Sequence, residues 1–133
     1  MDTERKKRER TVSWEDPFLV PQAAVGKKAV FEGEPGEYLY NPIGVVHGGF
    51  AMTLLDSAMG CAIHSTLAAG ERYTTLEVKS NFVRAITVDT GRVRCEGVVV
   101  HRGGTVATAE GRLIAIASGK LLAHGTTTCL IVR

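Results

Sequence analysis

The chain has 133 residues, of which 44% are hydrophobic and 23% are charged, so its length and composition are those of one globular domain. The formal charge of +2 is too small for the concentrated basic surface that binds nucleic acid, so no nucleic-acid partner is expected. Three cysteines, Cys61, Cys95 and Cys129, form no C-x-x-C pair. We expect them to be reduced structural thiols in a cytoplasmic protein.

Residues 1–24 are predicted to form an N-terminal arm that is partly disordered. The arm begins with basic residues that acidic residues interrupt, and Pro17 and Pro21 punctuate its second half. No apolar segment follows the basic residues, so they do not belong to a signal peptide. We interpret them as a solvated segment. A single folded domain is predicted over residues 25–133.

The domain is predicted to open with two short strands. Val25–Phe31 and Glu37–Tyr40 are the candidates, because a turn that contains Pro35 separates them. Asn41, Pro42 and Gly44 then predict a loop.

Residues 48–69 predict one long helix. This stretch is rich in Ala, Leu and Met and carries a single formal charge, Asp56, which is typical of a helix buried on nearly all sides. Its length would just span a bilayer, but it contains several polar side chains, and no other segment could accompany it in a membrane. No membrane association is therefore expected.

After Gly70 the pattern has a period of two and is rich in Val and Thr, which predicts strands. Four strands are expected, at about residues 72–84, 91–101, 105–117 and 120–132. Leu76 and Val78 alternate with charged residues, so one face of the sheet should pack on the core and the other should face water or a partner. A long apolar helix followed by antiparallel strands predicts an α+β fold in which the sheet wraps one helix.

Several common catalytic and cofactor motifs are absent from the sequence. It contains no G-x-S-x-G elbow, no phosphate-binding loop, no G-x-G-x-x-G and no H-E-x-x-H. Its histidines, none of them at the i, i+4 spacing of a helical metal site, are His47, His64, His101 and His124. Neither a metal nor another cofactor is therefore expected.

Asp56 is the first candidate for chemistry. No Lys or Arg occurs between Gly48 and Ala69, so the carboxylate has no counterion within its own helix. Burying an unpaired charge is costly, so such a residue either finds a partner from another element or is kept for its reactivity. Both interpretations stay open from this residue alone.

The entrance of the helix, His47-Gly48-Gly49, is the second candidate. Two glycines are poor helix formers, but they let a ligand approach the first free N–H groups, at the positive end of the helix dipole. An oxyanion hole requires such donors, although glycines before a helix also serve turns.

Together these residues carry a resemblance to a known family. The segment NPIGVVHGGFAMTLLDSAMG is similar to the active-site region of hotdog-fold acyl-CoA thioesterases of the phenylacetate-degradation (PaaI-like) type. The similarity continues through YTTLEVKSNFVRAI, VVVHRGGTVATAEG and HGTTTC, from about Gly33 to the C-terminus. It implies a long central helix wrapped by an antiparallel sheet, homodimers and usually homotetramers, and hydrolysis of acyl- or aryl-CoA thioesters.

The resemblance also implies roles for individual residues. Asp56 would be the nucleophile or general base, and the backbone N–H of Gly48 would form the oxyanion hole. Asn41 and His47 would shape the site around the thioester, and Thr74 would help to hold water. The residues implied to line the substrate and CoA channel are Thr75, Phe82, Arg84, Ala85, His101, Arg102, Gly103, Gly104, Thr105 and Val106. Of these, Arg84 and Arg102 would be available to phosphates.

The sequence departs from the family at two points. Gly104 stands where relatives often carry a second basic residue, which weakens the expected nucleotide contacts. The region between Pro17 and Val25 is short, as if an early helix found in relatives were missing.

Two alternative functions deserve comparison with the thioesterase hypothesis. Hotdog-fold hydratases and dehydratases typically carry a His five residues after the helix Asp, and here that position is Cys61. A non-catalytic acyl-CoA-binding module stays open, although a regulator of that kind would need a DNA-binding domain, for which the arm before Val25 is too short. The sequence does not specify the acyl group.

Helix geometry adds one prediction about assembly. Gly48 and Asp56 are eight residues apart on the predicted helix, and at ~1.5 Å per residue their backbones lie about 12 Å apart along its axis. An attacking group and an oxyanion donor must each lie roughly 3 Å from the reacting atoms. The site is therefore predicted to combine Gly48 of one subunit with Asp56 of another.

Overall fold

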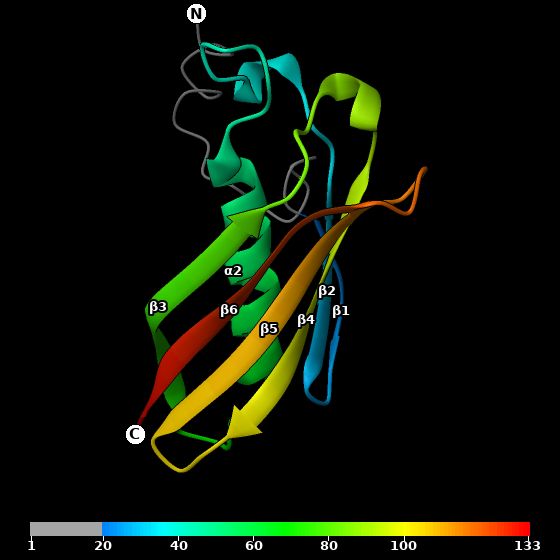
Figure 1. Ribbon diagram of the computed structural model, residues 1–133. Coiled ribbons are helices and arrows are strands. Elements are labelled where there is room, and N and C mark those ends of the chain that lie inside the picture. Colours follow the sequence, from blue (N-terminus) through cyan, green and yellow to red (C-terminus); the bar gives the residue numbers. More distant parts are fainter. Residues whose placement is uncertain (1–19) are drawn as a thin grey trace, which may run out of the picture.

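The computed structural model describes residues 20–133 (Figure 1). In chain order the elements are strands β1 (Val20–Val25) and β2 (Lys28–Gly33), the 3-10 helix η1 (Glu37–Leu39), helix α2 (Gly48–His64), strand β3 (Arg72–Phe82), the 3-10 helix η2 (Val88–Thr90), and strands β4 (Val93–Arg102), β5 (Val106–Ala115) and β6 (Leu121–Val132). The strands form one six-stranded sheet in the order β1-β2-β4-β5-β6-β3. Every pairing is antiparallel.

Helix α2 lies along one face of this sheet (Figure 1). Alternate residues of β4 and β5 face the helix and are buried, as the period of two predicted. The largest fully buried hydrophobic side chains of the core are Phe31, Leu54, Leu55, Met59, Ile63, Val93 and Leu113. The predicted α+β architecture, with a sheet wrapped around one long helix, is confirmed.

Glycines let neighbouring elements approach the middle of the sheet closely. Gly97 pairs with Gly111, and Gly111 pairs with Gly125, so the three form a row across β4, β5 and β6. A Cβ on Gly97 would lie 2.3 Å from the carbonyl oxygen of Ala58 in α2, whereas a Cβ on Gly125 would lie 2.3 Å from the carbonyl oxygen of Lys79 in β3. Because no side chain separates the backbones of Gly97 and Ala58, Gly97 sets how closely α2 packs on the sheet.

The N-terminal part of the sheet differs from the prediction. The single strand predicted over Val25–Phe31 is wrong, because the chain turns back at Gly26 (φ +57°) and forms the hairpin of β1 and β2. Strand β1 includes residues 20–24, which were predicted to belong to the arm. The rest of the arm, and the part of the expected missing helix before Val20, lie outside the described residues.

The predicted strand Glu37–Tyr40 is also wrong. Residues 37–39 form η1, in which the backbone N–H of Tyr40 donates to the carbonyl of Glu37 at 3.0 Å. Tyr40 then makes an isolated β-bridge to Val46. A four-residue segment is too short for its period to separate a strand from a turn of helix.

Helix α2 ends at His64, five residues before the predicted end at residue 69. The hydroxyls of Ser65 and Thr66 donate to the carbonyls of Ala62 and Ile63, both at 2.6 Å, so polar side chains cap the last turn. No helix within residues 20–133 is long and apolar enough to cross a bilayer.

The prediction that this helix is buried on nearly all sides is wrong for a single chain. Gly49, Thr53, Asp56 and His64 are exposed and lie three to eight residues apart, so they form one stripe along the helix. The stripe lies on the side of α2 that the sheet of the same chain does not cover.

Strand β3 is an edge of the sheet, next to this exposed stripe. Leu76 was predicted to share the buried face with Val78, and this is wrong, because Leu76 is 59% exposed. A β-bulge between Thr75 and Glu77 shifts the alternation by one residue. The four strands predicted after Gly70 are confirmed to within a few residues at each end.

Candidate active site

The first turn of α2 leaves one backbone donor free. His47 is the N-cap, and its Nδ1 accepts a hydrogen bond from the N–H of Gly49 at 3.0 Å. The carbonyl of His47 accepts from the N–H of Phe50 at 3.0 Å. The N–H of Gly48 has no acceptor among residues 20–133. It is therefore available to a ligand at the positive end of the helix dipole.

The capping contact also fixes the form of the imidazole. Nδ1 of His47 can accept a hydrogen bond only when it carries no hydrogen, so the neutral ring carries its hydrogen on Nε2. The side chain is exposed, and its Nε2–H remains for a second contact.

Gly48 opens onto a cavity of about 280 Å³, which we call the Gly48 cavity. The loop before α2, the first turn of α2 and the segment after β3 line it. Of the residues predicted for the site, the cavity brings together Asn41, His47, Gly48, Phe82, Arg84 and Ala85. The ring of Phe82 would lie 3.2 Å from a Cβ at position 48, so an alanine there would require the ring to move by a few tenths of an ångström.

Asn41 holds the loop that closes one side of this cavity. Its Oδ1 accepts hydrogen bonds from the backbone N–H groups of Ile43 at 3.1 Å and Val45 at 3.3 Å. The side-chain oxygen is therefore used within the loop, and the amide NH₂ is the part left for a ligand.

Asp56 lies at a second hollow, which we call the Asp56 cavity. It has a volume of about 410 Å³, and its walls are Gly49, Met52, Thr53 and Val78. No ion pair or hydrogen bond to the carboxylate of Asp56 is found in the described part of the chain. Partial burial raises the pKa of this carboxyl. Within one chain, Gly48 and Asp56 thus open onto different cavities.

The structure places two residues near Asp56 that the sequence analysis did not assign to the site, Tyr73 and Cys61. A Cβ at Gly60, one turn after Asp56, would lie only 2.8 Å from the hydroxyl of Tyr73, so the tyrosine ring fills a notch in the helix. Burial, and then the charge of Asp56, raise the pKa of Cys61. Burial is also the main cause of the raised pKa of Tyr73. A glycine inside a helix was the available signal of this close approach.

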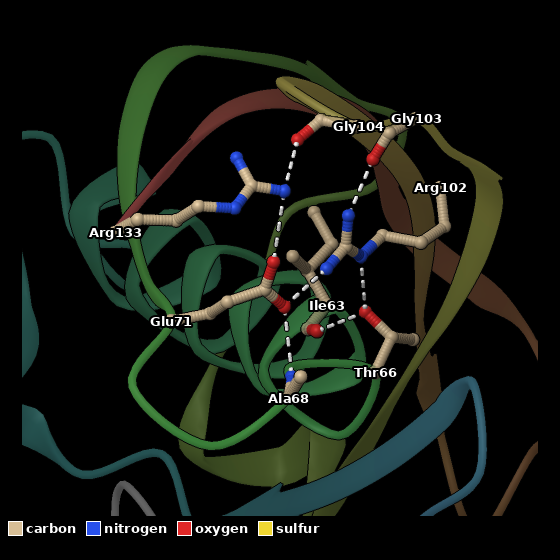
Figure 2. Close-up of polar contacts among 8 residues, drawn as sticks. All are labelled: Ile63, Thr66, Ala68, Glu71, Arg102, Gly103, Gly104 and Arg133. Atoms are coloured by element: carbon tan, nitrogen blue, oxygen red, sulfur yellow. Dashed lines mark hydrogen bonds and ion pairs between the residues drawn. The ribbon is translucent and has the colours of Figure 1, made fainter.

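Arg102 lies at the far end of α2 and is held by Glu71 (Figure 2). Its Nη2 is 2.6 Å from Oε1 of Glu71, its Nε donates to Oγ1 of Thr66 at 3.1 Å, and its Nη1 donates to the carbonyl of Gly103. Arg133 binds the second oxygen of Glu71 at 3.1 Å. All three nitrogens of Arg102 therefore have a partner within the described part of the chain, and its role towards phosphates stays a prediction.

The Glu71 carboxylate is correspondingly stabilised in its charged form. The backbone N–H of Ala68 donates to it at 2.8 Å, and this hydrogen bond is the first cause of its lowered pKa, with the charges of Arg102 and Arg133 acting in the same direction. We call this group, Glu71 with Arg102 and Arg133, the Glu71 clamp.

The residues predicted to line the CoA channel fall into two separate groups. The N–H of Arg84 donates to the carbonyl of Leu122, whereas Arg102 pairs with Ala107, which pairs with Cys129. Leu122 and Cys129 are seven residues apart on β6, or about 23 Å at ~3.3 Å per residue. His101, Gly103, Gly104, Thr105 and Val106 lie with Arg102 at the far end.

The two predicted threonines lie on β3 towards the same far end. Thr75 pairs with Cys129, and its Oγ1 is 3.7 Å from the sulfur of that cysteine. Thr74 alternates with Tyr73, whose ring packs on the helix, so Thr74 is directed away from the helix and does not line the Asp56 cavity.

Two groups of the site could take part in chemistry: a backbone donor at a helix N-terminus and a carboxylate, neither of which has a partner within the described residues. The first can polarise a carbonyl, and the second can act as a base or a nucleophile. No group of three His, Cys, Asp or Glu side chains that could hold a metal ion occurs within residues 20–133.

Comparison with known proteins identifies the family. A family model described as the thioesterase superfamily matches residues 43–121, which is more than half of the 133 residues and includes all of helix α2. The chain belongs to the thioesterase superfamily. No curated protein gave a significant match.

Several solved structures are similar to this thioesterase-superfamily chain in both sequence and fold. A conserved protein of Pseudomonas aeruginosa is 30% identical with a TM-score of 0.81, over 96% of this chain and 98% of that one. Zebrafish thioesterase superfamily member 2 is 27% identical with a TM-score of 0.75, over 84% and 80% of the two chains. A mutant of the phenylacetic acid degradation protein PaaI of Thermus thermophilus is 27% identical with a TM-score of 0.75, over 84% and 91%. The predicted PaaI-like hotdog family is confirmed.

Proposed function

We propose that this protein is an acyl-CoA thioesterase that hydrolyses an acyl- or aryl-CoA to the free acid and CoA. The observation that carries the proposal is the N–H of Gly48, which has no acceptor among residues 20–133, whereas His47 accepts hydrogen bonds from the N–H groups of Gly49 and Phe50. A tetrahedral intermediate on a thioester carbonyl develops negative charge on oxygen, and a preorganised donor at a helix N-terminus stabilises that charge.

Asp56 supplies the second requirement, a group that delivers water or attacks in its place. As a general base it takes a proton from water while the water oxygen bonds to the carbonyl carbon, and collapse of the intermediate expels the CoA thiolate, which takes up a proton. As a nucleophile its oxygen bonds to the carbonyl carbon, the C–S bond breaks to expel the CoA thiolate, which takes up a proton, and water then hydrolyses the acyl–aspartyl anhydride to the free acid and the Asp56 carboxylate. Both routes need the ionised carboxylate, and no side chain of residues 20–133 forms an ion pair with it, so its lone pairs are not used within this part of the chain.

The site is completed by a second copy of the chain. Gly48 and Asp56 open onto different cavities, and eight helical residues separate them by about 12 Å along the axis. The exposed stripe of α2 and the adjoining edge strand β3 form one continuous uncovered face of the subunit. A two-fold dimer through this face brings Asp56 of one subunit to Gly48 of the other. Pairs of such dimers would form the tetramer that the family resemblance implies.

The position five residues after Asp56 argues against the hydratase alternative. Those enzymes use a histidine there, and here the residue is Cys61, whose thiol is kept protonated because burial raises its pKa. No single residue distinguishes a thioesterase from a non-catalytic acyl-CoA-binding module, so an experiment must decide between them.

The direct test is a panel of short, long and aromatic acyl-CoAs, assayed for release of the CoA thiol, with Asp56→Asn as the control. We expect turnover of at least one substrate by the wild type and loss of about 10² or more in kcat in the variant. Saturable binding of acyl-CoA without any thiol release would favour the non-catalytic module instead.

A further inference from the structure

A second cleft adjoins the Gly48 cavity. It has a volume of about 630 Å³ and lies between η2 and the turn that joins β5 to β6. Arg84, Ala85 and Leu122 line both hollows, so the two are neighbours. Figure 1 shows η2, the β5–β6 turn and the start of α2 at the same end of the molecule. We call this hollow the Arg84–Lys120 cleft, after its two cations.

Neither cation has a partner in the described part of the chain. Arg84 and Lys120 form no ion pair, and their side chains make no hydrogen bond, within residues 20–133. By contrast, Arg92, Arg94 and Arg102 are all paired with glutamates. The cleft therefore holds two positive charges that are not neutralised internally, against one carboxylate in its lining, that of Asp89.

The hydroxyls of the cleft are arranged to donate. Thr87 and Thr90 form a capping box in which each side-chain oxygen accepts from the backbone N–H of the other residue. The oxygen of Ser118 accepts from the backbone N–H of Lys120 at 3.3 Å. A hydroxyl whose oxygen already accepts keeps its own hydrogen for another partner. All three therefore offer O–H donors beside the two cations.

This chemistry selects an anion with several acceptor oxygens. We propose that the Arg84–Lys120 cleft binds phosphate of the substrate's nucleotide, with Lys120 as a phosphate-binding residue that acts together with Arg84. The proposal rests on the thioesterase function proposed above, in which the thioester lies at Gly48. The pantetheine arm of a CoA thioester then runs past Ala85 and Leu122 and carries the phosphates into the cleft. Arg102, about 23 Å away and held in the Glu71 clamp, takes no part on this chain.

The test compares Lys120→Gln with Lys27→Gln, which removes an exposed lysine outside the cleft. Three substrates with the same acyl group are used: the acyl-CoA, the acyl-3′-dephospho-CoA and the acyl-pantetheine. We expect Lys120→Gln to raise KM for acyl-CoA about three- to tenfold with little change in kcat, and Lys27→Gln to leave KM unchanged. With acyl-pantetheine, which has no phosphodiester or nucleotide, KM of Lys120→Gln should equal that of the wild type.

The dephospho substrate distinguishes the phosphates. If the effect of Lys120→Gln persists with acyl-3′-dephospho-CoA, the cleft holds the pyrophosphate, and if it disappears, the cleft holds the 3′-phosphate. Either result supports the cleft. An equal rise in KM for acyl-CoA and acyl-pantetheine would overturn it, because the lysine would then act on the arm or on the fold.

Calorimetric titration with free CoA keeps the cleft testable without turnover. We expect the affinity for CoA to fall in Lys120→Gln and not in Lys27→Gln, and to fall more steeply with salt in the wild type than in Lys120→Gln. If the wild type hydrolyses thioesters while Lys120→Gln and Arg84→Gln keep wild-type KM and CoA affinity, the cleft proposal is wrong and the thioesterase proposal stands. If the wild type hydrolyses no thioester, the thioesterase proposal is wrong, and the CoA titrations alone decide the cleft.

Discussion

Gly97→Ala should damage both the fold and the site, because this glycine sets the position of α2. The added Cβ would lie 2.3 Å from the carbonyl oxygen of Ala58 and 2.7 Å from the nitrogen of Met59, and ordinary contact begins near 3.4 Å. The atoms in the way belong to the helix backbone, so no side chain can turn aside, and the helix must move by about 1.1 Å. We therefore expect the upper end of the overpacking range, ~3 kcal/mol.

This free energy converts into a measurable shift of the melting temperature. An unfolding entropy of ~2.1 cal/mol/K per residue over 133 residues is ~0.28 kcal/mol/K, so ~3 kcal/mol lowers Tm by about 11 °C. Because α2 carries Gly48 and Asp56, a shift of about 1 Å should also reduce kcat/KM by up to ~10²-fold.

The assay is thermal unfolding at one fixed protein concentration, since association changes Tm. Gly104→Ala is the matched control, because a Cβ there meets no atom within 4 Å and the backbone has no positive φ. A Tm of Gly97→Ala within about 2 °C of the wild type would refute the argument that backbone contact at Gly97 fixes the helix.

Four further predictions concern Asp56, His47 and the Glu71 clamp. Burial raises the pKa of Asp56, so the acid limb of kcat/KM should lie above the ordinary value of 3.8. Because the pKa is raised in the folded state, ionisation of Asp56 lowers the free energy of unfolding at neutral pH. Asp56→Asn should therefore have a Tm no lower than that of the wild type, which thermal denaturation at pH 7 will check. His47→Ala should lose about 1 kcal/mol of stability in urea with the loss of the N-cap, whereas His47→Asn, which keeps an acceptor, should lose little. Glu71→Gln should be less stable than the wild type at pH 7. The lowered pKa of Glu71 contributes stability above its ordinary value of 4.5 that is lost as the pH falls through the folded value, so the two unfolding curves should converge in acid.

The sequence predicted the architecture because its strongest patterns are long. The apolar stretch that begins at Gly48 and the strands after Gly70 each extend over enough residues for their period to be read. Short segments failed for the same reason. Residues 37–40 are too few to show a period. In the segment Val25–Phe31, which the pattern predicts as one strand, a two-residue turn that begins at Gly26 separates β1 from β2.

The candidate site was predictable where local geometry decides it. His47, Gly48 and Asn41 meet at one cavity because they are close in the sequence around the start of α2. The role of Arg102 towards phosphates stays a prediction from resemblance, and its pairing with Glu71, 31 positions away in the sequence, could not be predicted from a local pattern. The sequence pattern also does not indicate the proposed role of Lys120, because the cleft forms only when the β5–β6 turn lies beside η2.

The central claim is that one thioester is held by Gly48 of one subunit and attacked through Asp56 of another, and mixing two inactive variants tests it most directly. Gly48→Pro deletes the N–H, and proline is tolerated at the first position of a helix. Gly48→Ala is the matched control, because it keeps the N–H and meets the same Phe82 ring, 3.2 Å from the new Cβ. We expect Gly48→Pro to lose about 10² or more in kcat relative to Gly48→Ala.

Gly48→Pro and Asp56→Asn are then refolded together at equal concentrations, with each variant refolded alone as the reference. In a mixed dimer one site carries both lesions and the other carries neither. Random pairing makes half of the dimers mixed, so the account predicts recovery of about a quarter of the wild-type activity per subunit. If both variants are folded and exchange subunits, yet the mixture is no more active than either variant alone, the shared site is contradicted.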